Sequence, residues 1–169
     1  DVYQGTELWD LSLVDPDNRR PVDYEFRAKA LRQIGPLHTL WSTRSNGEIK
    51  LALLHRLHIT RNRYNDVLTD GEYLPVQIEG KYAQHVIAFI RRNKSGSLLV
   101  AVPLHFGKID RYDEHVSMPV ADWENTLLVL PEKSRSPWKD LLNDGEISIE
   151  GKLKLNDAFR KFPAMILKS

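Results

Sequence analysis

Side chains that can bind hydroxyl groups are concentrated in residues 1–21 of the chain. They are carboxylates and guanidinium groups, at Glu7, Asp10, Asp15, Asp17, Arg19 and Arg20. A carboxylate accepts hydrogen bonds on two oxygens and a guanidinium donates several from one plane, so both can hold the neighbouring hydroxyls of a sugar. The residues support a second interpretation equally well: Arg19 or Arg20 pairs with Asp15 or Asp17 only to keep the shape of a loop.

These groups are predicted to lie on a loop. Val2, Tyr3 and Gln4 have the form of a strand end, which Gly5 breaks. The following residues 6–21 are too polar for a buried strand and too often interrupted by turn residues for a helix. Because functional groups are often carried on loops that a rigid scaffold positions, we interpret the rest of the chain as that scaffold.

The composition is that of an ordinary globular protein. The chain has 169 residues, with 24 basic against 23 acidic side chains and a formal net charge of +1. The length suits one medium domain or two small units, and the even charge balance indicates neither a nucleic-acid nor a membrane partner. The chain lacks cysteine, which excludes disulfides and thiolate metal sites. No apolar run approaches the roughly 20 residues of a membrane span, and no signal peptide is visible, so we expect a cytoplasmic protein.

The start of the chain is also informative. It begins at Asp1, and its only methionines are Met118 and Met165. A chain that opens at the end of a strand, without an initiator methionine, is expected to be the C-terminal fragment of a longer protein.

Two helices are predicted in the first part of the chain. The first spans residues 22–34, with Asp23 and Glu25 in the turn where the helix dipole favours negative charge. Its apolar side chains recur at helical spacing, at Val22, Phe26, Ala30, Leu31 and Ile34. The second helix spans residues 46–64 and begins with Ser45 and Glu48 in the spacing of a capping box.

From residue 73 the pattern changes to short runs typical of β-strands, separated by turn residues. The predicted strands are Tyr73–Ile78, His85–Ile90, Leu98–Leu104, Thr126–Leu130, Ser136–Leu142, Glu146–Ile149, Lys152–Leu155 and Ala164–Leu167. Many short strands without intervening helices favour an antiparallel β-sandwich. Apolar residues at every position from Val86 to Ile90 predict a strand covered on both faces, and residues 105–125 are predicted to be a long loop. The expected fold class is therefore α+β.

Other groups that could do chemistry have ordinary structural explanations. His55 and His58 have a helical spacing compatible with a metal, but no further ligand follows, so no metal site is predicted. His105 could join His115 and the carboxylates of Asp110, Asp113 and Glu114, although a solvated loop explains them as well. Exposed aromatic side chains on the sandwich could stack on sugars, or could simply pack in the core: Tyr82, Tyr112, Trp123 and Trp138.

The opening residues resemble a known group of enzymes. DVYQGTEL, from Asp1 to Leu8, is similar to the end of the eighth barrel strand in glycoside hydrolases of the α-amylase superfamily. WDLSLVDPDNRRPVDY, from Trp9 to Tyr24, resembles one family within it, the maltooligosyltrehalose synthases, or (1→4)-α-D-glucan 1-α-D-glucosylmutases. Weaker matches follow through the chain, at GEYLP (71–75), AFIR (88–91), LVAVP (99–103) and FPAMIL (162–167).

The resemblance implies an architecture. Residues 1–70 would be the C-terminal end of a catalytic (β/α)₈ barrel, contributing about two helices and a substrate loop at residues 3–21. Residues 71–169 would be a C-terminal antiparallel β-sandwich domain. The partners implied are a maltooligosaccharide substrate and the N-terminal barrel portion of the same protein.

The resemblance also implies a reaction and a set of binding residues. The family moves the reducing-end α-1,4 bond of a maltooligosaccharide to an α,α-1,1 bond, by retaining intramolecular transglycosylation without a cofactor. Its catalytic carboxylates match no position here, so the fragment alone is expected to be inactive. Substrate contacts are expected from Asp15, Asp17, Arg19 and Arg20, with Gln4 and Glu7 shaping the base of the loop. The alternatives are an independent glucan-binding module and a non-catalytic interaction domain.

Overall fold

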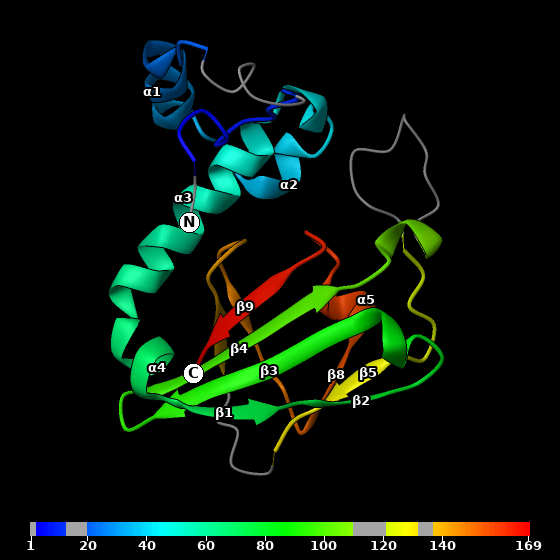
Figure 1. The fold of residues 1–169 in the computed structure, drawn as a ribbon. Coiled ribbons are helices and arrows are strands. Elements are labelled where there is room, and N and C mark those ends of the chain that lie inside the picture. Colours follow the sequence, from blue (N-terminus) through cyan, green and yellow to red (C-terminus); the bar gives the residue numbers. More distant parts are fainter. Residues whose placement is uncertain (1–2, 13–19, 110–120, 132–136) are drawn as a thin grey trace.

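Most of the helices in this chain precede the strands. The computed structural model describes residues 3–12, 20–109, 121–131 and 137–169. Figure 1 shows α1 and α2 at one end and the strands at the other, with α3 between them and α5 among the strands. The helices are α1 (Tyr24–Arg32), α2 (Leu37–Leu40), α3 (Glu48–Arg63), α4 (Asn65–Asp70) and α5 (Leu155–Ala158), with 3₁₀ turns η2 (Arg44–Asn46), η3 (Ala83–His85) and η4 (Phe106–Lys108). The predicted α+β class is confirmed.

Helix α1 forms where the sequence predicted it. Asp23 caps its N-terminus, where the carboxylate accepts a hydrogen bond of 2.8 Å from the backbone N–H of Phe26. Of its apolar residues only Ala30 is buried, in a small cluster with Leu8 and Leu51, whereas Phe26 and Leu31 are exposed. The apolar face of this helix is therefore largely uncovered in this chain.

Helix α3 also forms as predicted, but its start differs. The predicted capping box is wrong, because Ser45 lies inside η2 and the Asn46 side chain accepts the Glu48 N–H at 2.9 Å. The chain then turns at Gly47, whose φ of 82° is in the left-handed region. A Cβ there would lie 2.7 Å from the backbone nitrogen of Trp9, so only glycine fits this close approach.

Two antiparallel sheets follow the helices. The larger has the strand order β1-β3-β4-β9-β6-β7 and the smaller the order β2-β5-β8. Every pairing between named strands is antiparallel, as predicted. The strands are β1 (Glu72–Pro75), β2 (Gln77–Glu79), β3 (Val86–Asn93), β4 (Gly96–Pro103), β5 (Leu127–Val129), β6 (Trp138–Asp140), β7 (Glu146–Ile147), β8 (Lys152–Lys154) and β9 (Met165–Lys168).

The predicted single strand at residues 73–78 is wrong, because the chain changes sheets within it. β1 pairs with β3 of the larger sheet, and β2 pairs with β5 of the smaller one. Val76 lies at the crossing, where it is buried and its N–H bonds the Ala88 carbonyl at 3.0 Å. Tyr73, Leu74, Val76 and Ile78 form one apolar pattern through both strands, so the sequence did not mark the break.

Strand β3 is covered on one face and only partly on the other. Val86, Ala88 and Ile90 are buried in the core shared by the two sheets. On the opposite face Ile87 is exposed, and Phe89 stacks on Tyr73 with 5.2 Å between ring centroids. The prediction that both faces are covered is thus wrong at Ile87.

The core between the sheets contains Trp123 and Trp138, two of the four aromatic residues for which stacking on sugars was one interpretation. Trp123 is 1% exposed and Trp138 is 0% exposed, and both belong to the shared apolar cluster. A surface role for them is therefore wrong. The third aromatic of that set, Tyr82, is half-buried and packs edge-on against Trp123, whereas Tyr112 lies outside the described residues.

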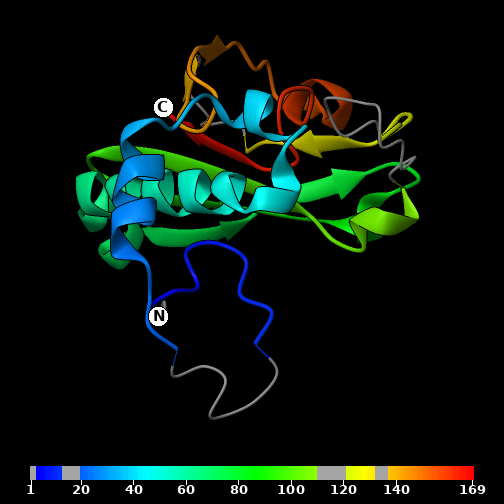
Figure 2. The same cartoon turned by 90° about the horizontal axis from the view of Figure 1, so that it is seen from above.

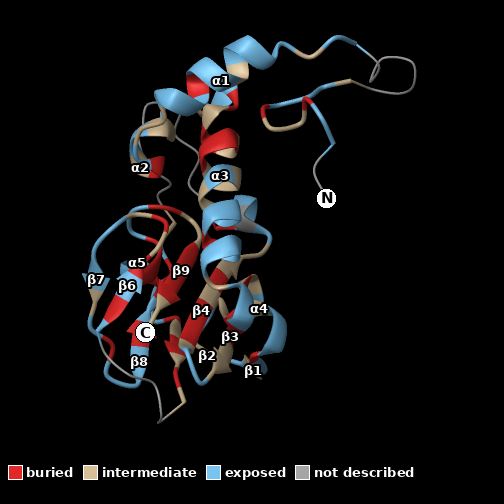
Figure 3. Ribbon diagram, turned by 90° about the vertical axis from the view of Figure 1, so that its left-hand side faces the viewer, coloured by how far each residue is buried: buried red, intermediate tan, exposed pale blue. Residues whose placement is uncertain are grey.

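The helices pack on the other face of the larger sheet. Leu98 and Ile166 from the strands form a cluster with Leu37, Ala52 and Val67 from α2, α3 and α4. Hydrogen bonds also join the helices to the sheet region. The Arg91 guanidinium donates to the Leu68 carbonyl at 2.9 Å, and the Arg56 guanidinium donates to the Leu142 carbonyl at 2.6 Å. Figure 3 shows this arrangement, with buried residues where α3 and the strands meet.

Candidate functional site

The predicted loop is described from Tyr3 to Ser12. In Figures 1 and 2 these residues lie beside α1 and the N-terminal part of α3, away from both sheets. A turn at Gly5 shapes the start of the loop, with φ of 90°, and the Thr6 N–H bonds the Tyr3 carbonyl at 3.1 Å. The glycine is required for the positive φ, and it lies against Val22, which a Cβ would approach to 3.1 Å.

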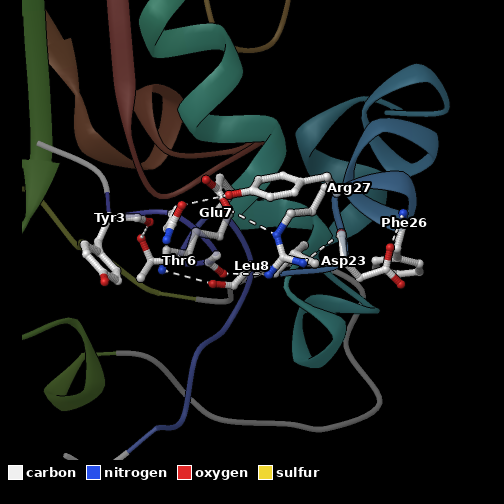
Figure 4. A network of polar contacts seen from close by, with 11 residues as sticks. Tyr3, Thr6, Glu7, Leu8, Asp23, Phe26 and Arg27 are labelled. Carbon is white, nitrogen blue, oxygen red and sulfur yellow. Dashed lines mark hydrogen bonds and ion pairs between the residues drawn. The ribbon is translucent and has the colours of Figure 1, made fainter. Parts of the chain in front are cut away.

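Arg27 of α1 fixes this turn to the helix. Its guanidinium donates to the Glu7 carboxylate at 3.1 Å, to the Gly5 carbonyl at 2.7 Å and to the Asp23 carbonyl at 3.0 Å. Figure 4 shows the Arg27 side chain lying between Glu7 and Asp23. A planar guanidinium with several donors can bridge three acceptors in this way, so α1 determines where the base of the loop lies.

Gln4 is held by the same helix. Its side-chain oxygen accepts a hydrogen bond of 2.9 Å from the Tyr24 hydroxyl. The side chains of Gln4 and Glu7 therefore both contact α1, from positions on either side of the turn.

Charged groups gather farther along the loop, around Asp10. The Asp10 carboxylate accepts hydrogen bonds from the Ser12 hydroxyl at 2.5 Å and from the Ser12 N–H at 2.9 Å. These two bonds are the main reason that the pKa of Asp10 lies below its usual value, and the nearby cations Arg20 and Lys50 lower it further. Asp10 is thus ionised at neutral pH, with two cations near it.

Trp9 is held between this loop and α3. Its indole N–H donates to the Arg44 carbonyl at 2.7 Å, and the Lys50 ammonium lies 5.3 Å from the centroid of its ring. The same ammonium donates to the Leu8 carbonyl at 3.2 Å. The ring is nevertheless 50% exposed.

The structure thus places some of the predicted site residues, and it brings residues that were not predicted into contact with the loop. Gln4 and Glu7 lie at the base of the loop on α1, and Arg20 lies near Asp10. Asp15, Asp17 and Arg19 lie outside the described residues. Sequence reasoning missed Arg27, Trp9 and Lys50. No local spacing marks Arg27 or Lys50, which lie 20 and 42 residues beyond their loop partners Glu7 and Leu8.

Neither a metal centre nor a membrane-spanning helix is found among the residues that the structure describes. No group of three or more histidine, aspartate or glutamate side chains is arranged to hold a metal ion in the part of the chain that the structure describes. Within the same residues, no helix has the length and apolar character needed to cross a membrane. Of the loop histidines, His105 packs against His85 with 6.0 Å between ring centroids, and residues 110–115 are outside the described ranges.

Replacing Arg27 by alanine should loosen the loop without unfolding the sheets. The change leaves the carboxylate of Glu7, whose side chain is only 29% exposed, without its ion pair. We expect a loss of about 1–3 kcal/mol in the free energy that holds the loop on α1, as for other partly buried groups that lose a charged partner. Hydrogen exchange should be faster at the amides of residues 5–8 but unchanged in β3 and β4.

The matched control is Lys29→Ala on the same helix, because Lys29 is exposed. Equal exchange rates at residues 5–8 in the Arg27→Ala and Lys29→Ala proteins would contradict the role assigned to Arg27.

Known proteins similar to this chain identify the family that it resembles. A Mycobacterium tuberculosis protein (strain CDC 1551 / Oshkosh), described by name as a maltooligosyl trehalose synthase, is 35% identical over 167 residues, or 99% of this chain. This chain is homologous to one segment of the maltooligosyltrehalose synthases. The corresponding protein of M. tuberculosis strain H37Rv (ATCC 25618) gives the same identity and coverage. No protein-family model matches the chain.

Solved structures of such synthases agree with this result. The maltooligosyltrehalose synthase of Arthrobacter ramosus superposes on all of this chain with a TM-score of 0.73 and 27% identity. A single-substitution mutant of that enzyme gives a TM-score of 0.73 and 26% identity. The chain spans 18% of the length of the curated relatives and 20% of the Arthrobacter chain.

Proposed function

We propose that this chain is the C-terminal part of a maltooligosyltrehalose synthase. Such an enzyme would isomerise the reducing-end α-1,4 bond of a maltooligosaccharide to an α,α-1,1 bond, which leaves a terminal trehalose unit. The observation that carries the proposal is the 35% identity to a named synthase over 99% of the chain. The order of helices and then antiparallel sheets, shared with the Arthrobacter enzyme at a TM-score of 0.73, supports it.

The proposed division of the chain follows from this function. Residues 1–70 would complete a catalytic (β/α)₈ barrel, and residues 71–169 would form a β-sandwich domain that caps it. In barrel enzymes the active site lies at the C-terminal ends of the strands, and residues 3–21 would be the loop that leaves the last strand. The change from α4 to β1 at residues 70–72 supports this boundary. The enzyme would work in the cytoplasm.

The chemistry would be shared between the longer protein and this loop. A carboxylate nucleophile of the longer protein would attack C1 of the penultimate glucose while a glutamic acid protonates O4 of the leaving glucose. That glucose would then turn, and its anomeric hydroxyl, deprotonated by the same glutamate, would attack C1 and release the nucleophile. Retention by these two steps requires carboxyl groups roughly 5–5.5 Å apart. The segment alone is expected to be inactive.

The loop would keep the released glucose in place between the two steps. Asp15, Asp17, Arg19 and Arg20 would bind its hydroxyls, on a base shaped by Gln4 and Glu7. Holding the sugar near the intermediate favours its anomeric hydroxyl over water as the attacking group, and a closed loop excludes competing water. The anchoring of Gln4 and Glu7 on α1 supports a loop base of defined shape.

Product partition in the longer enzyme tests this role. In Arg19→Ala and Arg20→Ala variants the ratio of trehalose-ending product to free glucose should fall about tenfold or more, because a hydrogen bond to a charged group contributes about 1.5–3 kcal/mol. Arg32→Ala, at the exposed end of α1, is the matched control and should leave the ratio unchanged. The proposal fails if both loop variants retain wild-type activity and a wild-type product ratio.

A further inference from the structure

We propose that Trp9 is a platform on which a glucose ring of the substrate stacks. This inference rests on the proposed function and extends it to a residue outside the predicted set of arginines and carboxylates. It is carried by three observations: the ring is immobilised, it is half exposed, and the Lys50 ammonium lies over it at the start of the polar loop.

Contacts from two parts of the chain immobilise the ring. The indole N–H bonds the Arg44 carbonyl at 2.7 Å, which ties it to η2. Gly47 then passes so close that a Cβ there would lie 3.2 Å from the indole Cδ1 atom. The Lys50 ammonium, 5.3 Å from the ring centroid, holds the Leu8 carbonyl next to it at 3.2 Å. Because the ring is already fixed, a ligand that stacks on it loses little additional side-chain freedom.

The exposure of the ring distinguishes it from the tryptophans that serve packing. Trp9 is 50% exposed, whereas Trp123 and Trp138 in the core are 1% and 0% exposed. Indole is the largest side chain, and leaving half of it in water forgoes much of the stabilisation that burial provides. A rigid, flat and half-exposed aromatic ring at the start of a polar loop is what a binding site needs and a core does not.

The surroundings of the ring match the chemistry of a pyranose. A pyranose carries C–H groups on its faces and hydroxyls around its rim. Ligand sites commonly combine an aromatic surface with a few polar groups that fix orientation. Here the Lys50 ammonium lies over one face of the ring, and the groups that bind the hydroxyls would be the carboxylate of the next residue, Asp10, and Arg20 near it. The loop would thus hold one glucose by its hydroxyls and by one apolar face.

The test uses the full-length enzyme that contains this chain, with maltopentaose as substrate. Trp9→Ala should raise KM about tenfold, the change expected for the loss of one aromatic contact. Trp9→Phe keeps a flat ring but removes the indole N–H, and it should raise KM much less. Tyr73→Ala is the matched control, because Tyr73 is 52% exposed but lies on β1, and its KM should equal that of the wild type. Thermal midpoints are measured for all variants.

The outcomes separate this inference from the function on which it rests. If Arg20→Ala changes the product ratio but Trp9→Ala leaves KM unchanged, the function stands and the platform is rejected. A fall in thermal midpoint without a change in KM would instead show that Trp9 packs against another part of the protein. Equal KM values for Trp9→Ala and Trp9→Phe, both raised, would show that only the bond to Arg44 matters. If Arg19→Ala, Arg20→Ala and Trp9→Ala all leave catalysis unchanged, the proposed role of the loop and the platform both fail.

Discussion

Replacing Trp138 by alanine should lower the unfolding free energy of the chain by about 3–5 kcal/mol, the usual cost of removing a buried aromatic side chain. Trp138 is 0% exposed and lies in the core shared by the two sheets. Its strand β6 joins β9 to β7 at the edge of the larger sheet, so the cavity would open between strands that few others support. Urea unfolding followed by circular dichroism measures the change.

Trp138→Phe provides the matched control. The indole N–H of Trp138 is buried and has no hydrogen-bond partner among the described residues. Phenylalanine keeps much of the volume and removes this unpaired donor, so its cost should stay within about 1–2 kcal/mol. Similar costs for the alanine and phenylalanine variants would contradict the assignment of Trp138 to core packing, because phenylalanine keeps much of the packed volume that alanine removes.

A second large effect is expected at two adjacent leucines of β4 that face opposite sides. Leu98 packs against the helices, and Leu99 packs in the core between the sheets; both are 0% exposed. Each alanine variant should lose about 2–5 kcal/mol. The two losses should appear in different places, because each cavity weakens a different interface.

Hydrogen exchange resolved by segment locates the losses. Leu98→Ala should increase exchange chiefly in α2, α3 and α4, and Leu99→Ala chiefly in β5 and β8. This comparison also tests the proposed division at residues 70–71, since two units that fold semi-independently would respond separately. An identical exchange pattern in both variants would show instead that the helices and sheets unfold as one unit.

Local signals explain why so much of the secondary structure was predictable. Helix α1 depends on Asp23 and on residues three or four apart, which are neighbours in the sequence. The predicted strands each overlap an observed one, because alternation and turn residues act within a few positions. The short helices α2 and α4, of four and six residues, were missed because they contain too few turns to show a period.

The sequence by itself also indicated a resemblance to one family, through one contiguous polar motif at residues 1–24. It could not determine which of those side chains are anchored and which are presented. Arg27 reaches Glu7 across 20 residues, and Trp9 reaches Arg44 across 35. Those contacts, the crossing between sheets at Val76 and the burial of Trp123 and Trp138 were decided by the tertiary structure. The physical reason is that they depend on packing between segments distant in sequence, which no local period records.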